Sequence, residues 1–311
     1  MQILTVPKDK PLRLAFSPDG RYLAGGGGRA FHLWDLIAGP KPLWSLPKSD
    51  LALNFIFTPD GSALRGGSHS EFARYDTLMG RSERDSALCV LDPALFSPDG
   101  RFGLTVGIDR DGGTLWLSCA AITSFGYAPV WEKRIRYDPQ HEPSGYRVLL
   151  FSVDGNRVVR VAGRGTRDRN NTTQTRVEVF DAGDGKLIAH WVGKLPYYAG
   201  EGAIDPSGAV ALFNGRALHI IDPSEPDAEP VKRVNASPKP LEAVAFSRDG
   251  SRFVAVGRDA VATLWDATNW EVKRRYEWKI GPLKSVCFAP DGLRCAAGSD
   301  TGQVVVWDLD D

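Results

Sequence analysis

One five-residue phrase recurs seven times along the chain and divides it into repeating units. The copies share a closing Gly and, in six cases, an Asp just before it: FSPDG at 16–20, FTPDG at 57–61, FSPDG at 96–100, FSVDG at 151–155, IDPSG at 204–208, FSRDG at 246–250 and FAPDG at 288–292. The closing glycines are 41, 39, 55, 53, 42 and 42 residues apart. The chain is therefore built from seven copies of one supersecondary unit of about 40 residues, with insertions in the third and fourth intervals.

The phrase predicts a hairpin turn, because Pro presets φ, Asp bonds its own backbone and Gly takes the positive φ that reverses the chain. A short strand of small residues follows it. A third strand then ends in an aromatic or apolar residue plus Asp: Trp34-Asp35, Tyr75-Asp76, Phe180-Asp181, Ile221-Asp222, Trp265-Asp266 and Trp307-Asp308. Only the third unit, Trp116-Leu117, lacks this Asp. Most units add a fourth strand, and a four-stranded unit of this period is typical of a propeller blade.

The turn phrase with Trp-Asp some fourteen to fifteen residues later resembles the WD-repeat family of β-propellers over essentially the full length. The resemblance implies an all-β, seven-bladed β-propeller of four-stranded antiparallel blades, forming a single domain over 1–311. We expect blades at about 11–46, 51–84, 92–135, 146–192, 200–234, 240–278 and 282–308, the last completed by an N-terminal strand at 2–6. That closure would leave no unpaired edge around the ring.

The chain departs from the family pattern in having no Gly-His pair before its blades. In the family that His bonds an Asp in the turn after the second strand. Three candidate Asp residues remain, and we expect them to bond backbone or hydroxyl groups instead: Asp109, Asp259 and Asp300.

Composition and charge limit the classes of function that the chain can have. Hydrophobic residues make up 42% of the chain, and Lys plus Arg equals Asp plus Glu at 38 each, which argues against a general nucleic-acid binder. No secretory leader and no apolar run long enough to span a bilayer are visible. The four cysteines have no C-x-x-C spacing, so we expect buried free thiols in a cytoplasmic protein.

No catalytic or metal-binding pattern stands out. The five histidines are scattered, the repeated Asp-Gly pairs are explained by turn chemistry, and Asp109 to Gly112 lacks the remaining ligands of a calcium loop. We therefore predict a non-catalytic scaffold without metal or cofactor. Two alternatives remain open: a propeller enzyme such as a lactonase-like hydrolase with ligands in the channel, and a purely architectural subunit of a larger assembly.

Family members typically bind partner proteins or peptides on the top face, where the turns between second and third strands meet the connections between blades. Long loops there are the usual place for recognition. The predicted contacts combine Arg with aromatic residues, a composition enriched in binding hot spots: Arg164, Arg167, Arg169, Tyr197, Tyr198, Arg136 and His141. We expect the polar residues Arg13, Asn54 and Glu201 to line the channel, and a protein or peptide partner bound by a monomeric propeller.

Overall fold

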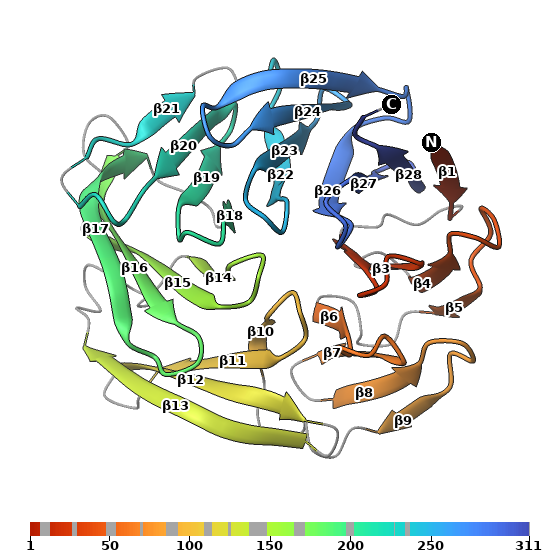
Figure 1. The fold of residues 1–311 in the computed structure, drawn as a ribbon, viewed down its shortest axis with the longest axis horizontal. Coiled ribbons are helices and arrows are strands. Elements are labelled where there is room, and N and C mark those ends of the chain that lie inside the picture. Colours follow the sequence, from red (N-terminus) through yellow and green to blue (C-terminus); the bar gives the residue numbers. More distant parts are fainter. Residues whose placement is uncertain are drawn as a thin grey trace. The chain divides into compact units, whose positions relative to one another are not determined.

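The computed structural model describes residues 1–6, 13–26, 30–47, 54–68, 71–84, 93–108, 114–123, 126–136, 148–164, 172–196, 202–226, 228–233 and 237–310. These residues form 28 strands and no helix, so none of them belongs to a helix that could cross a membrane. The chain divides into two compact units, Met1–Asp92 with Ser237–Asp311, and Pro93–Ala236. Figure 1 shows the strands, and we number the blades in the order of their turn phrases.

The first unit contains blades 6, 7, 1 and 2, each a four-stranded antiparallel sheet. Its strands are β2 (Arg13–Phe16), β3 (Tyr22–Gly26), β4 (Ala30–Asp35) and β5 (Trp44–Pro47) in blade 1; β6 (Asn54–Phe57), β7 (Ala63–Ser68), β8 (Glu71–Asp76) and β9 (Ser82–Arg84) in blade 2; β22 (Leu241–Phe246), β23 (Arg252–Gly257), β24 (Val261–Asp266) and β25 (Glu271–Glu277) in blade 6; and β26 (Leu283–Phe288), β27 (Arg294–Ser299), β28 (Gln303–Asp308) and β1 (Gln2–Thr5) in blade 7.

The second unit contains blades 3, 4 and 5, which have the same four-stranded order. Its strands are β10 (Pro93–Phe96), β11 (Phe102–Ile108), β12 (Thr114–Thr123) and β13 (Gly126–Arg136) in blade 3; β14 (Val148–Phe151), β15 (Arg157–Arg164), β16 (Thr172–Asp181) and β17 (Leu187–Pro196) in blade 4; and β18 (Gly202–Ile204), β19 (Val210–Asn214), β20 (Ala217–Ile221) and β21 (Val231–Arg233) in blade 5.

The N-terminal strand completes the last blade, as the sequence predicts. β1 pairs antiparallel with β28, with Gln2 opposite Val306 and Thr5 opposite Gln303, and the sheet order is β1-β28-β27-β26. The seven four-stranded antiparallel sheets confirm the predicted fold class, a seven-bladed β-propeller closed by its N-terminal strand.

The turn phrase forms the predicted hairpin between the first and second strands of a blade. In blade 1, Asp19 accepts hydrogen bonds from the Ser17 hydroxyl and, at 3.0 Å, from the Arg21 backbone N–H. Gly20 has a φ of 70°, the left-handed region that a side chain would disfavour. The same bond from the backbone N–H two residues on reaches five further turn carboxylates: Asp60, Asp99, Asp154, Asp249 and Asp291. These carboxylates are thus occupied in shaping turns.

The Asp of the aromatic-Asp pairs shapes the second hairpin, between the third and fourth strands. Each accepts a hydrogen bond from the backbone N–H two residues on, as an Asx turn does. The pairs are Asp35 with Ile37, Asp76 with Leu78, Asp181 with Gly183, Asp222 with Ser224 and Asp266 with Thr268. The repeated Asp therefore has a structural reason in at least five blades.

The hydrophobic core lies between neighbouring sheets. Trp34 and Leu23 of blade 1 are fully buried against Val304 and Ala296 of blade 7. Blades 6 and 7 share a similar cluster, which includes Trp307. In the second unit, apolar clusters join blade 3 to blade 4 and blade 4 to blade 5. Within each unit, stability therefore depends on adjacent blades staying in contact.

Aromatic residues of the fourth strands add a hydrogen bond to the next blade. Trp44 Nε1 donates to the Thr77 carbonyl at 2.9 Å, and Trp131 Nε1 to the Ala182 carbonyl at 2.8 Å. Equivalent bonds join Trp191 Nε1 to the Ala228 carbonyl at 2.9 Å and Tyr276 Oη to the Leu309 carbonyl at 2.7 Å. The ring supplies apolar area while its polar atom satisfies a turn carbonyl.

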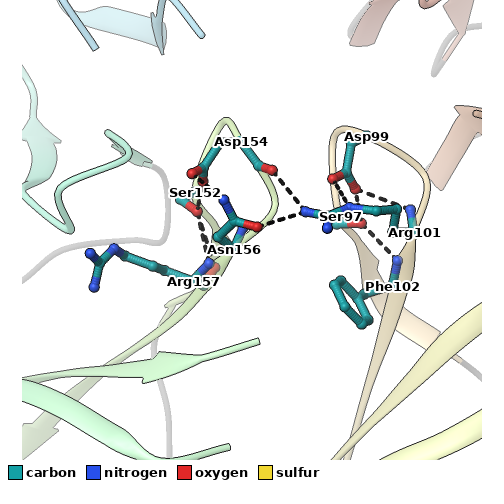
Figure 2. A network of polar contacts seen from close by, with 8 residues as sticks. All are labelled: Ser97, Asp99, Arg101, Phe102, Ser152, Asp154, Asn156 and Arg157. Carbon is teal, nitrogen blue, oxygen red and sulfur yellow. Dashed lines mark hydrogen bonds and ion pairs between the residues drawn. The ribbon is translucent and has the colours of Figure 1, made fainter. Parts of the chain in front are cut away.

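Arginines of the first hairpin turns also reach the next blade. Figure 2 shows Arg101 of blade 3, whose Nη2 donates to Asn156 Oδ1 at 2.7 Å and to the Asp154 carbonyl at 3.2 Å in the turn of blade 4. Its Nε contacts Asp99 of its own turn. Similar bonds run from Arg157 to the Pro206 carbonyl, from Arg252 to the Gly292 carbonyl and from Arg294 to the Gly20 carbonyl. The first hairpin turns of blades 4, 5, 7 and 1 are thus each bonded by an Arg of the preceding blade.

Candidate interaction surface

Strand pairing defines two edges of every blade. We call the edge with the turn between second and third strands the top edge, and the edge with the two other hairpin turns the bottom edge. In blade 4, Arg164 at the end of β15 pairs with Gln174, and Thr172 pairs with Pro196 at the end of β17. Arg164 and Pro196 therefore both lie at the top edge of blade 4.

Most of the predicted contact residues lie outside the described residues: Arg167, Arg169, Tyr197, Tyr198 and His141. Arg164 is the last residue of β15, at the top edge of blade 4. Arg136 is the exposed last residue of β13 and pairs with Thr114, which places it at the top edge of blade 3. The predicted patch thus remains a prediction, with these two arginines at the expected edges.

The predicted channel residues belong to first strands. Arg13 is the exposed first residue of β2 and pairs with Gly26. Asn54 is the first residue of β6 and pairs with Gly67. Glu201 lies outside the described residues.

The repeated Trp residues are part of the core. Trp34, Trp265 and Trp307 are buried, and their Nε1 atoms have no hydrogen-bond partner within the described part of the chain. Trp116 is half-buried in β12. In this chain the repeated Trp contributes packing area.

The Asp of these pairs also takes part in ion pairs. Asp35 lies 2.7 Å from Arg21, and this hydrogen bond lowers the pKa of Asp35. Asp266 lies 3.2 Å from Lys273, and Asp308 lies 4.0 Å from the Met1 amino group.

The turn after the second strand shows how the chain manages without the Gly-His pair. Asp259 accepts a hydrogen bond from the Ser237 hydroxyl at 2.7 Å and another from the Val261 backbone N–H at 3.2 Å. Ser237 in turn accepts from the Lys239 backbone N–H. A hydroxyl thus bonds the turn Asp in blade 6, while Asp109 lies outside the described residues.

Asp300 does not occupy the position of Asp259. Ala260 and Gly302 share a positive φ and the same hydrogen bond back to the residue three places earlier, so they are equivalent. The residue before each of them is Asp259 in blade 6 and Thr301 in blade 7, so Thr301, not Asp300, is equivalent to Asp259. The Thr301 hydroxyl donates to the Ile280 carbonyl at 2.7 Å. Thr301 therefore holds this turn in blade 7 through its hydroxyl.

A charged cluster lies at the top edge of blades 6 and 7. Glu242 of β22 lies 2.9 Å from Lys284 Nζ of β26, and it also contacts the Arg258 guanidinium, which follows β23. The register of both first strands shifts at these residues, between Leu241 and Ala243 and between Leu283 and Ser285. A β-bulge re-aims the side chain of its extra residue, which accounts for the meeting of the two side chains across blades.

The electrostatics of the cluster keep it charged. Partial burial disfavours the ionised form of Glu242, but the hydrogen bonds from Arg258 and Lys284 outweigh it and lower the pKa of Glu242. The same contact raises the pKa of Arg258. The three groups carry one net positive charge at the ends of two sheets, with Arg258 exposed and Glu242 and Lys284 largely buried.

The described residues offer little for catalysis. They contain no group of three or more His, Cys, Asp or Glu side chains that could hold a metal ion. Burial raises the pKa of Cys119 to about 12 and that of Cys287 and Cys295 well above the ordinary value, so none of these thiols is ionised at neutral pH. His32 contacts the Ser45 hydroxyl at 2.8 Å, and its ring is buried.

The sequence did not point to Glu242, Arg258 and Lys284. A signal was available, because Glu242 and Lys284 stand at the same place in two adjacent repeats, LEAVAF and LKSVCF. A charge at the start of an otherwise apolar first strand conflicts with burial and indicates a bulge or a functional edge.

The comparison with protein families agrees with the fold. The WD40 family model, described as WD domain, G-beta repeat, matches residues 2–35, 228–266 and 276–308. Each match ends at the Asp of an aromatic-Asp pair, at Asp35, Asp266 and Asp308. No curated protein matches the chain. The seven four-stranded blades, their aromatic-Asp pairs and these three matches together support a WD-repeat β-propeller.

Proposed function

We propose that the chain is a non-catalytic scaffold that binds a partner protein or peptide at the top edge of its blades. The observation that carries this proposal is the cluster of Glu242, Arg258 and Lys284. Its side chains come from two adjacent blades and stay partly exposed, and Glu242 and Lys284 lie at β-bulges. Charged groups fixed on rigid strands suit recognition, since little side-chain entropy is lost when a partner binds.

Binding fits the described residues better than catalysis does. The free thiols have raised pKa values, and the turn carboxylates are engaged by backbone N–H groups. A cytoplasmic location is part of the proposal, supported by three free cysteines among the described residues. The family supports the general role, because WD-repeat propellers commonly mediate protein–protein interaction.

The test compares two charge reversals at opposite edges of one blade. Arg258→Glu changes the top edge of blade 6, whereas Arg248→Glu changes an exposed residue of the bottom turn of the same blade. Each variant and the intact chain would capture partners from host extract, with retained proteins identified by mass spectrometry and circular dichroism as the folding control. A partner retained by the intact chain and by Arg248→Glu, but lost with Arg258→Glu, supports the proposal.

A third form assigns the partner to one part of the top edge. Deleting residues 165–173 removes the whole segment between β15 and β16, which carries the predicted Arg167 and Arg169, and the first two residues of β16. Loss of the partner with this deletion alone would move the binding site from blades 6 and 7 to blade 4. A partner kept by every form would indicate an architectural role, and no partner for any form would direct attention to metal content and small-molecule turnover.

A further inference from the structure

Large apolar side chains are exposed at the bottom edge of blades 1 and 2. The turn after β4 exposes 79% of Ile37, and Leu43 just before β5 is 44% exposed. In the equivalent turn of blade 2, Leu78 is 62% and Met79 69% exposed. With the neighbouring basic residues Lys41 and Arg81, we call these residues the rim patch.

Trp44 makes the two halves of the rim patch continuous. It follows Leu43 directly and donates its Nε1 hydrogen to the Thr77 carbonyl at 2.9 Å, next to Leu78. Its ring also covers Gly80, where a Cβ atom would lie 2.8 Å from ring carbon Cδ2. Trp44 thus contacts the turn of blade 2 at both of its ends. Figure 1 shows β5 and β9 as the outer strands of blades 1 and 2.

The turn geometry does not require apolar residues at these positions. The residue two places after the turn Asp is Gly183 in blade 4, Ser224 in blade 5 and Thr268 in blade 6, and each donates the same backbone hydrogen bond. Blade 4 instead places an Asp184–Lys186 ion pair in its turn. Exposing Ile37, Leu78 and Met79 to water has no local structural benefit, and contiguous exposed apolar groups mark interaction sites.

Among the described residues, the exposed charged side chains of the two turns are basic Lys41 and Arg81 and acidic Asp76, so basic groups outnumber acidic ones. Asp35 is buried and bonded to Arg21, and Asp76 accepts hydrogen bonds from the backbone N–H groups of Leu78 and Met79. Asp35 is thus withdrawn from the surface, whereas the Asp76 side chain stays exposed while it accepts these bonds. Lys41 and Arg81 are exposed beside the apolar side chains. The patch presents apolar area flanked by cations, which complements an apolar segment flanked by carboxylates.

We propose that the rim patch docks an amphipathic helix of a partner protein whose apolar face is flanked by Asp or Glu. The apolar side chains would cover Ile37, Leu78 and Met79, and the carboxylates would lie against Lys41 and Arg81. This surface is at the bottom edge, so the inference is independent of the top-edge function proposed above.

The probe is a fluorescein-labelled peptide of about four helical turns, with Leu on one face and Glu on the other. A matched peptide carries Lys in place of every Glu. Fluorescence anisotropy would measure the binding of both to the full chain. The triple variant Ile37→Ser, Leu78→Ser, Met79→Ser removes the apolar face, and the double variant Lys41→Glu, Arg81→Glu reverses the charges. Leu293→Ser is the control, since Leu293 is 52% exposed in a bottom-edge turn of blade 7.

The acidic peptide should bind the intact chain and the Leu293→Ser control alike, with the Lys peptide much weaker. Affinity should fall by about tenfold or more in the triple variant. It should also fall in the double variant, with a loss of salt dependence. No binding of the acidic peptide, equal binding of the Lys peptide or unchanged affinity in the triple variant would overturn the proposal. Self-association in sedimentation velocity that the triple variant abolishes would assign the patch to a second copy of the chain instead.

Discussion

Replacing Ala260 by Gly should stabilise the protein. Ala260 has a φ of 65° in the turn between β23 and β24, where the left-handed backbone costs an L residue about 1–2 kcal/mol. Its counterpart in blade 7 is Gly302, with a φ of 87°. Gly relieves the strain but gives the unfolded chain more freedom, which costs roughly 0.5–1 kcal/mol. The difference is a gain of about 0.5–1 kcal/mol in the free energy of unfolding.

Urea denaturation followed by Trp fluorescence measures this change, with the slope of the transition checked for constancy. Two matched variants control for the chemistry of the substitution. Gly302→Ala should lose about 1 kcal/mol or more, because it introduces the same strain in blade 7. Ala255→Gly, in the buried interior of β23, should be destabilising because no strain is relieved there. A loss of stability in Ala260→Gly together with no loss in Gly302→Ala would refute the argument.

Three further predictions follow from particular contacts. Trp270 also has a positive φ, at the turn position that Gly80 and Gly185 occupy in other blades. Because its ring packs edge-on against Phe246 and Phe253, Trp270→Gly should lower the free energy of unfolding by about 2 kcal/mol in urea denaturation, despite the relief of backbone strain. Arg160 is 2% exposed and lies 2.6 Å from Glu178. Glu178→Ala leaves the buried guanidinium unpaired and should lower the free energy of unfolding by about 3–5 kcal/mol, whereas Glu178→Leu combined with Arg160→Met should recover most of that loss. A double variant as unstable as the single one would contradict this. Folding lowers the pKa of Glu242, so its contribution to stability is present above the ordinary Glu pKa and is lost as the pH falls through the folded value. In Glu242→Gln the free energy of unfolding should therefore decrease less steeply as the pH is lowered. An unchanged pH dependence would contradict the role of the cluster.

The fold could be predicted because its determinants are local. Asp19 and Gly20 fix a hairpin turn within five residues, and Asp35 shapes the next turn through its own neighbours. Repetition of these local signals gives the number of sheets, and the unassigned strand at the N-terminus identifies the partner of β28. None of this requires knowledge of which blades touch.

The charged cluster and the rim patch could not be found in that way. Glu242 meets Lys284 only because two bulges shift the registers of strands in different blades, and a charge at the start of a first strand does not identify its partner in the next blade. In the sequence, Ile37 and Leu78 are ordinary apolar residues near a strand end, and only the structure shows that they stay exposed and that Trp44 joins their turns. Residue type alone pairs Asp300 with Asp259 as equivalent turn residues, whereas the positive φ of Gly302 and Ala260 shows that Thr301 is the equivalent of Asp259.

The repeated phrase also encodes contacts between blades, beyond the turn that it forms. Arg294 after the last phrase reaches the Gly20 carbonyl of the first turn, and Arg101 reaches the turn of blade 4 in the same way. At the other bottom-edge turn, Trp44 and Trp131 bond the carbonyl that follows the repeated Asp of the next blade. Blades 3, 4 and 6 are therefore each held to the next blade at two points of the bottom edge by residues that belong to the repeat itself. The top edge has no such repeated contact among the described residues, which leaves its side chains free to differ from blade to blade, as Glu242, Ser237 and Lys284 do.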